Sequence, residues 1–306
     1  IDDLTFKNYN TTLESNKKVT LLSPRNVDNG YLIESGFVTS DKNIDIPNSD
    51  SMWSIIGNNK LTNKSPIKLS WANNQGITFE KEISLDDKYL FTIKQSVINS
   101  TNNNYDFYSY GQIIRNEIPE ISNFYILHEG LIATLDDELI EEDYDDIQEK
   151  KFSRTSQKGW LGISDKYWIT SLIPPKEKEF KTTFDYKKKF RANFIATEPL
   201  ELKGKNKVEE KLQIIIAAKR VDIIDGYAES LNIDKFDLVI DWGFLYFITK
   251  PLFFGIDYFF KLLGNYGLAI IAITICIRLA FFPLANFSFR SMAKMKALQP
   301  EMVRLK

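Results

Sequence analysis

The sequence predicts a large antiparallel β-sandwich domain, followed by helices that associate with a membrane. Many segments within residues 1–235 alternate apolar and polar residues with a period of two, as strands with one buried face do. These residues hold 31 Lys and Arg against 37 Asp and Glu, a net charge of −6, whereas residues 236–306 hold 8 against 4, a net charge of +4. An apolar run of 19 residues, 267–285, carries a single charge. Two environments are therefore predicted, one aqueous and one lipid.

The overall composition excludes several classes of protein. Hydrophobic residues make up 43% and charged residues 26% of the 306, close to soluble averages, so a disordered chain is excluded. The net charge of −2 argues against a nucleic-acid partner. One Cys and one His exclude a disulfide framework and a Cys- or His-rich metal site, and we expect no cofactor. We interpret the chain as a fragment, because it begins at Ile1 and ends at Lys306 inside a helical pattern.

The strand pattern recurs along the first part of the chain. Residues 77–85 and 89–97 place apolar side chains on odd positions, and residues 105–113 repeat this after the turn-forming cluster 99–104. Residues 180–194 continue it with Phe and Tyr on even positions and mostly charged residues opposite. Many such strands over about 200 residues predict one sandwich domain.

Three segments interrupt this pattern. Nine acidic residues fall within Asp136–Lys150, which resembles a cation site, but like-charge blocks are usually exposed and we interpret it as a solvated loop or short helix. Pro174 and Pro175 end a strand or turn the chain. Apolar residues spaced by three or four within 220–231 predict a helix that leads from the sandwich towards the membrane.

Residues 266–289 are predicted to span the bilayer. The 19 residues of its apolar run nearly match a hydrocarbon core of ~30 Å at 1.5 Å per residue. The alternative is a buried core helix. Five basic residues against one acid follow in residues 290–306, the start of a further helix. By the positive-inside rule that end lies in the cytoplasm, and residues 1–235 lie in the periplasm of a Gram-negative cell.

Residues 236–265 are predicted to lie along the membrane interface. Within Trp242–Leu263 the charges Lys250, Asp257 and Lys261 fall within about 40° of one another on a helix, and apolar residues fill the remaining circumference. Pro251 suits the first turn of a helix, so we expect the helix to begin near Thr249. A second spanning helix, forming a hairpin with the first, is the alternative.

Arg278 lies deep within the predicted span, about 16 Å from its outer end. A central Arg costs about 2.5–3.5 kcal/mol on insertion scales, so it needs a water-filled cavity or a charged partner. Thr274 lies one turn earlier on the same face. The residues alone leave open whether Arg278 faces a cavity or pairs with a carboxylate on another helix.

Several motifs resemble one protein family. The run IAITICIRLAFFPL at 271–284, with SMAKMKALQPEM at 291–302, resembles the second transmembrane helix and first cytoplasmic loop of the YidC insertases, within the Oxa/Alb superfamily. FITKPLFFGIDYFFKLLGNYGLAI at 247–270 resembles the interfacial helix of that family. GWLGISDKYWITSLIPP at 159–175 and DGYAESLNIDKFDLVIDWGFLYF at 225–247 resemble its periplasmic domain in the alphaproteobacterial branch. The resemblance covers essentially the whole chain.

This resemblance implies a fold and a function. The fold is a periplasmic β-supersandwich similar to galactose mutarotases. The function is insertion and folding of inner-membrane proteins, alone or with the Sec translocon, through a hydrophilic groove. Arg278 matches the groove arginine of the family and Thr274 the polar residue above it, which favours the cavity. The implied partners are nascent inner-membrane proteins, Sec subunits, the ribosome and lipid, and the protein is expected not to be an enzyme.

Two alternatives remain: a membrane-anchored carbohydrate-binding protein or sugar epimerase, and a periplasmic scaffold. Sugar catalysis would need general acid–base groups, and His128 is the only histidine. The basic, Met-rich end argues against a mere anchor, because flexible Met side chains suit adaptable contacts with emerging chains or lipid. The predicted cytoplasmic contact residues are Met292, Lys294, Met295 and Lys296.

Overall fold

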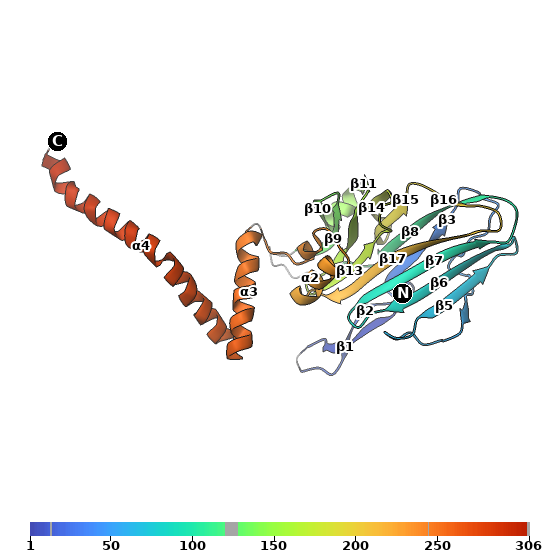
Figure 1. The fold of residues 1–306 in the computed structure, drawn as a ribbon, viewed down its shortest axis with the longest axis horizontal. Coiled ribbons are helices and arrows are strands. Elements are labelled where there is room, and N and C mark those ends of the chain that lie inside the picture. Colours follow the sequence, from blue (N-terminus) through green and yellow to red (C-terminus); the bar gives the residue numbers. More distant parts are fainter. Residues whose placement is uncertain (13, 120–127, 244, 305–306) are drawn as a thin grey trace. The chain divides into compact units, whose positions relative to one another are not determined.

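The computed structural model describes residues 1–12, 14–119, 128–243 and 245–304, which form two compact units, Ile1–Asp241 and Trp242–Lys306. The strands are β1 (Leu4–Asn10), β2 (Lys18–Leu22), β3 (Tyr31–Val38), β4 (Ser54–Ile56), β5 (Ile67–Ala72), β6 (Ile77–Leu85), β7 (Leu90–Asn99), β8 (Tyr105–Arg115), β9 (Gly130–Leu135), β10 (Glu138–Asp143), β11 (Phe152–Ser156), β12 (Gly159–Ser164), β13 (Trp168–Ile173), β14 (Phe180–Tyr186), β15 (Phe190–Ala196), β16 (Leu200–Leu202) and β17 (Lys207–Ala218). The helices are α1 (Tyr144–Glu149), α2 (Val221–Ser230), the 3-10 helix η1 (Phe236–Val239), α3 (Tyr246–Leu263) and α4 (Tyr266–Arg304) (Figure 1).

The first unit is the antiparallel β-sandwich that the alternating pattern predicts. A nine-stranded sheet has the order β10-β9-β12-β13-β17-β7-β6-β5-β4. A six-stranded sheet has the order β11-β14-β15-β8-β16, with β3 also paired to β8. Every pairing between described strands is antiparallel, including the separate pair β1–β2.

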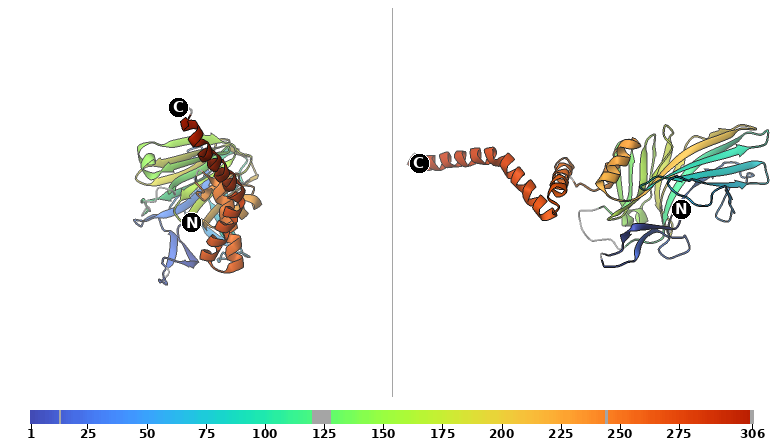
Figure 2. Two further views of the ribbon diagram at one scale, coloured as in Figure 1. Left: turned by 90° about the vertical axis from the view of Figure 1, so that its left-hand side faces the viewer. Right: turned by 60° about the horizontal axis from the view of Figure 1, so that its bottom comes forward.

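The main core lies between the two sheets. Ile113 and Phe194 of the six-stranded sheet and Ile93, Leu161 and Ile214 of the nine-stranded sheet belong to one buried cluster. The alternating residues of the same strands therefore face outward. On the nine-stranded sheet this outer face is covered in turn by α2 and η1 (Figure 2), in a second buried cluster.

The β unit extends further than residue 235, where the sequence places its end. Phe236 and Val239 of η1 are buried in the second cluster, and the ring of Phe236 stands 5.1 Å from that of Trp160 at 83°. Residues 236–241 thus pack with the sandwich rather than with an interfacial segment. The difference arises because Trp160 comes from β12, far earlier in the chain, and no local pattern reveals that contact.

The acidic segment Asp136–Lys150 is also more ordered than a solvated loop. It forms β10 and α1, and the short helix is the predicted one. Ile140, Tyr144 and Ile147 are buried in the main core, so these apolar residues anchor the segment while its acids point to solvent. Among the described residues no cluster of acids, His and Cys is arranged to hold a metal ion.

The second unit contains α3 and α4, joined by a short turn. Gly264 ends α3 in the left-handed region at φ 67°, and its N–H donates to the Phe260 carbonyl at 2.8 Å. The rings of Phe260 and Tyr266 stack at 3.9 Å across the turn. The two helices approach closely at Gly255, where a Cβ atom would lie 2.8 Å from Cδ1 of Ile273.

Two predicted helix boundaries differ from those observed. α3 begins at Tyr246 rather than near Thr249, because the Leu245 carbonyl accepts from the N–H groups of Ile248 at 2.8 Å and Thr249 at 3.0 Å. Pro251 is therefore the sixth helical residue. The boundary at residue 289 has no counterpart, because α4 is one continuous helix from Tyr266 to Arg304.

Candidate functional site

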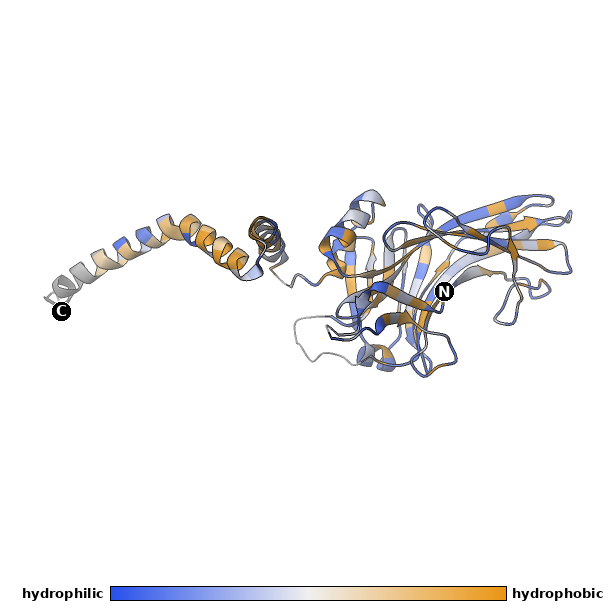
Figure 3. Ribbon diagram, turned by 90° about the horizontal axis from the view of Figure 1, so that it is seen from below, coloured by the Kyte–Doolittle hydropathy of each residue, from blue (hydrophilic) through white to orange (hydrophobic). Residues whose placement is uncertain are grey.

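Helix α4 contains the candidate membrane span. Within the described residues it is the one helix that is long and apolar enough to cross a bilayer, over Tyr266–Ala293. These 28 residues would measure about 42 Å if straight, longer than a hydrocarbon core of about 30 Å. Figure 3 shows the hydrophobic residues gathered along the first half of α4.

Arg278 lies in the middle of this span, and its side chain is exposed. It makes no hydrogen bond or ion pair with any residue that the structure describes. Thr274, one turn earlier, is also exposed, and its hydroxyl donates to the Ile270 carbonyl at 2.7 Å. The hydroxyl hydrogen of Thr274 is thus already bonded within α4. Only the lone pairs of the hydroxyl oxygen remain available, as acceptors of a further hydrogen bond.

The Arg278 side of α4 points away from α3. The residues of α4 on the side of α3 include Ala269, which is fully buried, and Ile273, whose side chain lies close to Gly255. At 100° per residue, Arg278 is about 140–180° around the helix from these two, while Thr274 is about 40° from Arg278. Helix α3 therefore leaves the predicted pair Arg278 and Thr274 uncovered.

The predicted charged residues of α3 keep to one stripe and find partners within the second unit. Lys261 Nζ lies 2.6 Å from Asp257 Oδ2, one turn apart. Lys250 Nζ lies 5.8 Å from the centre of the Trp242 ring. The apolar remainder of α3 includes the exposed Phe247 and Leu262. This distribution is typical of an amphipathic interfacial helix, and the position of α3 in a membrane stays a prediction.

The predicted cytoplasmic contact residues lie towards the end of α4. Met292 and Met295 are 46% and 67% exposed, so their flexible side chains are available for contact. The side chains of Lys294 and Lys296 lie outside the described part of the chain.

The β unit also contains a buried charge cluster that the sequence pattern did not indicate. Arg115 Nη1 donates to Asp165 Oδ1 at 2.6 Å, and both side chains are largely buried. Lys219 Nζ donates to Ser164 Oγ at 2.8 Å, and burial lowers the pKa of Lys219 to about 8. Burial raises the pKa of Asp165, and the neighbouring Arg115 opposes that shift. The cluster borders a cavity of about 670 Å³, and only the tertiary contacts bring its members together.

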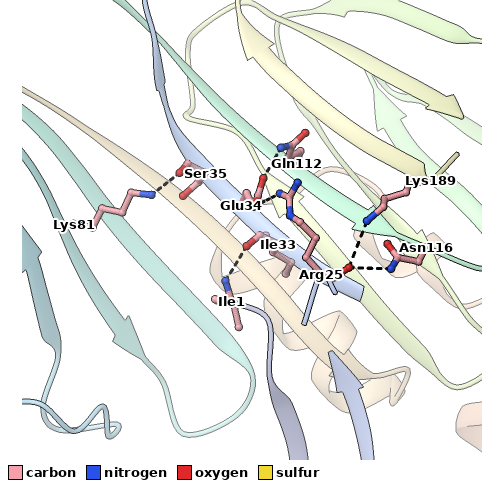
Figure 4. Close-up of polar contacts among 9 residues, drawn as sticks. All are labelled: Ile1, Arg25, Ile33, Glu34, Ser35, Lys81, Gln112, Asn116 and Lys189. Carbon is pink, nitrogen blue, oxygen red and sulfur yellow. Dashed lines mark hydrogen bonds and ion pairs between the residues drawn. The ribbon is translucent and has the colours of Figure 1, made fainter. Parts of the chain in front are cut away.

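A second cavity, of about 450 Å³, lies along β3 (Figure 4). Lys81 reaches from β6 to donate to the Ser35 carbonyl, and burial lowers the pKa of Lys81 to about 8. Glu34 accepts from Gln112 at 2.6 Å and pairs with Arg25. Figure 4 shows these side chains engaged with one another and with the backbone of β3.

His128, the one histidine, is held in place rather than presented to solvent. Its Nδ1 lies 3.3 Å from Asp143 Oδ1 and its Nε2 lies 3.2 Å from the Leu131 carbonyl. Its side chain is 10% exposed. The neighbouring Glu129 accepts from the Lys166 N–H at 2.7 Å. This geometry is that of an anchored side chain at the start of β9.

Comparison with known proteins relates both units to one family. Residues 1–254 match the model described as "YidC periplasmic domain", and residues 258–306 match "60Kd inner membrane protein". The Membrane protein insertase YidC of Pelagibacter ubique (strain HTCC1062) is 72% identical over 306 residues, which are all of this chain and 55% of that protein. The Membrane protein insertase YidC of Mesorhizobium japonicum is 37% identical over 314 residues, again with all of this chain and 52% of that protein.

The chain thus spans about half the length of the curated relatives it matches. Among solved structures, the galactose mutarotase related enzyme of Lactobacillus acidophilus matches with a TM-score of 0.41 and 9% identity, over 54% of this chain and 70% of that one. This distant likeness carries no argument about activity. From the match of 254 of its 306 residues to the periplasmic domain model and of the following residues to the inner membrane model, the chain belongs to the YidC family of membrane protein insertases.

Proposed function

We propose that this chain supplies the periplasmic domain and one groove-lining helix of an insertase that brings inner-membrane proteins into the bilayer. The observation that carries the proposal is Arg278: it lies mid-span in α4, exposed, and on the side away from α3. A charge at this depth is costly in lipid, by about 2.5–3.5 kcal/mol on insertion scales. A water-filled groove on this side of α4 removes that cost.

The groove acts by electrostatics and by shortening the apolar path. The Arg278 guanidinium attracts acidic or polar segments of an incoming chain, more strongly than in bulk water because the surroundings have a lower dielectric constant. The hydrated groove reduces the thickness of hydrocarbon that such a segment crosses. The apolar helix of the substrate then leaves sideways into lipid, and this step needs no ATP.

The proposal includes an orientation and partners. Residues 1–241 lie in the periplasm and the basic end of α4 in the cytoplasm, because basic residues are retained on the cytoplasmic side. The substrates are nascent inner-membrane proteins delivered by the ribosome, and Sec subunits act beside the insertase. Lipid surrounds α4, and α3 lies at the periplasmic interface.

Substitution of Arg278 in a full-length insertase tests the proposal. Arg278→Ala should slow insertion of a reconstituted substrate with an acidic translocated tail by on the order of tenfold or more, the effect of one charged contact. Arg278→Lys should retain part of the rate, because Lys supplies the charge without the planar fork. Leu284→Ala, an exposed apolar neighbour, serves as the control and should insert like the parent.

Protein abundance separates the groove from the ion-pair alternative. If Arg278 paired with a buried carboxylate, its removal would destabilise the protein by about 3–5 kcal/mol and membrane levels would fall. Normal levels with slowed insertion support the groove. An unchanged rate for Arg278→Ala with the acidic tail would show that the charge has no role in insertion.

A further inference from the structure

Pro283 lies inside the continuous helix α4, five residues after the groove residue Arg278. A proline has no backbone N–H, so the carbonyl of Leu279, four residues earlier, loses its intrahelical donor, and the ring pushes against that carbonyl. Figures 2 and 3 show α4 changing direction near its middle. Pro283 also lies near the middle of α4, and prolines are a common cause of bends in helices.

The freed carbonyl lies at the same depth as Arg278. Leu279 is 13 residues after Tyr266 and 14 before Ala293, about 20 Å from each end of the candidate span. A carbonyl without a donor is unfavourable in hydrocarbon, and prolines in spanning helices are tolerated where another donor satisfies the freed group. The Leu279 carbonyl therefore requires a hydrogen-bond donor near the middle of the membrane.

The neighbouring side chains of α4 do not supply that donor. The hydroxyl hydrogen of Thr274 is bound to the Ile270 carbonyl at 2.7 Å. Side chains on a helix lean towards its N-terminus, whereas carbonyls point towards its C-terminus, so the Arg278 guanidinium leans away from the Leu279 carbonyl. Helix α3 packs at Ala269 and Ile273, ten and six residues before Leu279. Among the described residues Asn286, seven residues after Leu279 and on the same face of α4, makes no hydrogen bond with this carbonyl, so the donor comes from outside α4.

We propose that the Leu279 carbonyl, freed by Pro283, is a second polar contact of the groove and accepts a hydrogen bond from the backbone of the crossing polypeptide. A peptide group carries one donor and one acceptor. Arg278 offers donors and the Leu279 carbonyl offers an acceptor, on consecutive residues of α4. Together they complement the unpaired donors and acceptors of an extended segment, at successive peptide groups. Pro283 is the positioning residue, and this inference rests on the proposed function.

The first test observes the carbonyl itself, in this chain reconstituted in phosphatidylcholine bilayers. A ¹³C=¹⁸O label at Leu279 gives an isolated infrared band. In the parent the band should have the frequency of a carbonyl outside the helix ladder, and in Pro283→Ala it should move to the helical frequency. Spin labels at Leu268→Cys and Phe289→Cys, with Cys276→Ser, should move apart in Pro283→Ala as α4 straightens. The same band and distance in both proteins would overturn the inference.

The second test measures insertion by a full-length insertase of a substrate with an uncharged polar tail. Pro283→Ala should insert it about two- to tenfold more slowly, the effect of one ordinary hydrogen bond. Replacing Pro283 by lactic acid removes both the ring and the N–H, so the Leu279 carbonyl stays free and the rate should recover. Leu284→Ala is the matched control.

The outcomes distinguish this contact from the groove as a whole. A parent-like rate for Pro283→Ala, or no recovery with lactic acid, would refute the role of the Leu279 carbonyl. The proposed function would still stand in that case if Arg278→Ala slows insertion of acidic substrates. A parent-like rate for Arg278→Ala would instead refute the proposed function. If Pro283→Ala lowers membrane levels, the lactic acid variant and the infrared band decide the question.

Discussion

Phe236 should be one of the residues on which the stability of the β unit depends most. Its side chain is fully buried, and its ring meets that of Trp160 at 5.1 Å, on the outer face of the nine-stranded sheet. Phe236→Ala removes this contact and leaves a cavity, because β12 cannot move towards the gap without breaking its pairing with β9 and β13. Substitutions of this kind cost about 3–5 kcal/mol, a large share of a typical total stability of about 5–15 kcal/mol.

The assay is urea unfolding of the polypeptide 1–241, followed by circular dichroism and Trp fluorescence. Phe236→Ala should lower the free energy of unfolding by about 3–5 kcal/mol, and a polypeptide ending at residue 235 should be destabilised at least as much. Glu229→Ala, exposed on α2, is the control and should change it by less than about 0.5 kcal/mol. If Phe236→Ala costs less than about 1 kcal/mol and chains 1–235 and 1–241 are equally stable, η1 is not part of the sandwich core.

Two further predictions concern orientation and pH. In a Cys276→Ser background on spheroplasts, an impermeant thiol reagent should label Asn102→Cys but not Met295→Cys, and the reverse pattern would contradict the orientation. Because burial lowers the pKa of Lys219 to about 8, the unfolded state binds more protons than the folded state between about pH 8 and 10, and stability should rise with pH across that window. In Lys219→Met the free energy of unfolding should rise by about 1–3 kcal/mol less than in the parent between pH 7.5 and 9.5. If this free energy has the same slope against pH in parent and variant, Lys219 is not the source of the rise.

Local patterns predicted the elements that depend on local properties. The alternation through 180–194 predicted β14 and β15, whose residues Phe180, Phe184, Phe190 and Phe194 are all buried. The spacing of three and four within 220–231 predicted α2, where Ile224 and Tyr227 face the sheet. Both predictions succeed because a strand or helix that is buried on one side repeats its apolar residues with the period of that element.

The same reasoning fails where a contact joins distant parts of the chain. Lys81 occupies an odd position in β6, where the alternation requires an apolar residue. It is tolerated because the Ser35 carbonyl of β3 accepts a hydrogen bond from its ammonium group. The boundary at residue 235 is wrong because Phe236 packs on Trp160. For Asp136–Lys150 a signal was present: Ile140, Tyr144 and Ile147 are spaced by four and three among the acids, and all three are buried.

For the candidate site, the sequence alone determined that Arg278 lies in an apolar run with Thr274 one turn earlier, since depth and helical spacing follow from position in the chain. Tertiary structure decided which side of α4 stays uncovered, because that depends on the packing of Gly255 against Ile273. It also assembled the buried cluster of Arg115, Asp165 and Lys219 from three strands' ends. Hydropathy and periodicity are properties of neighbouring residues, whereas a covered face or a paired buried charge exists only once distant segments meet.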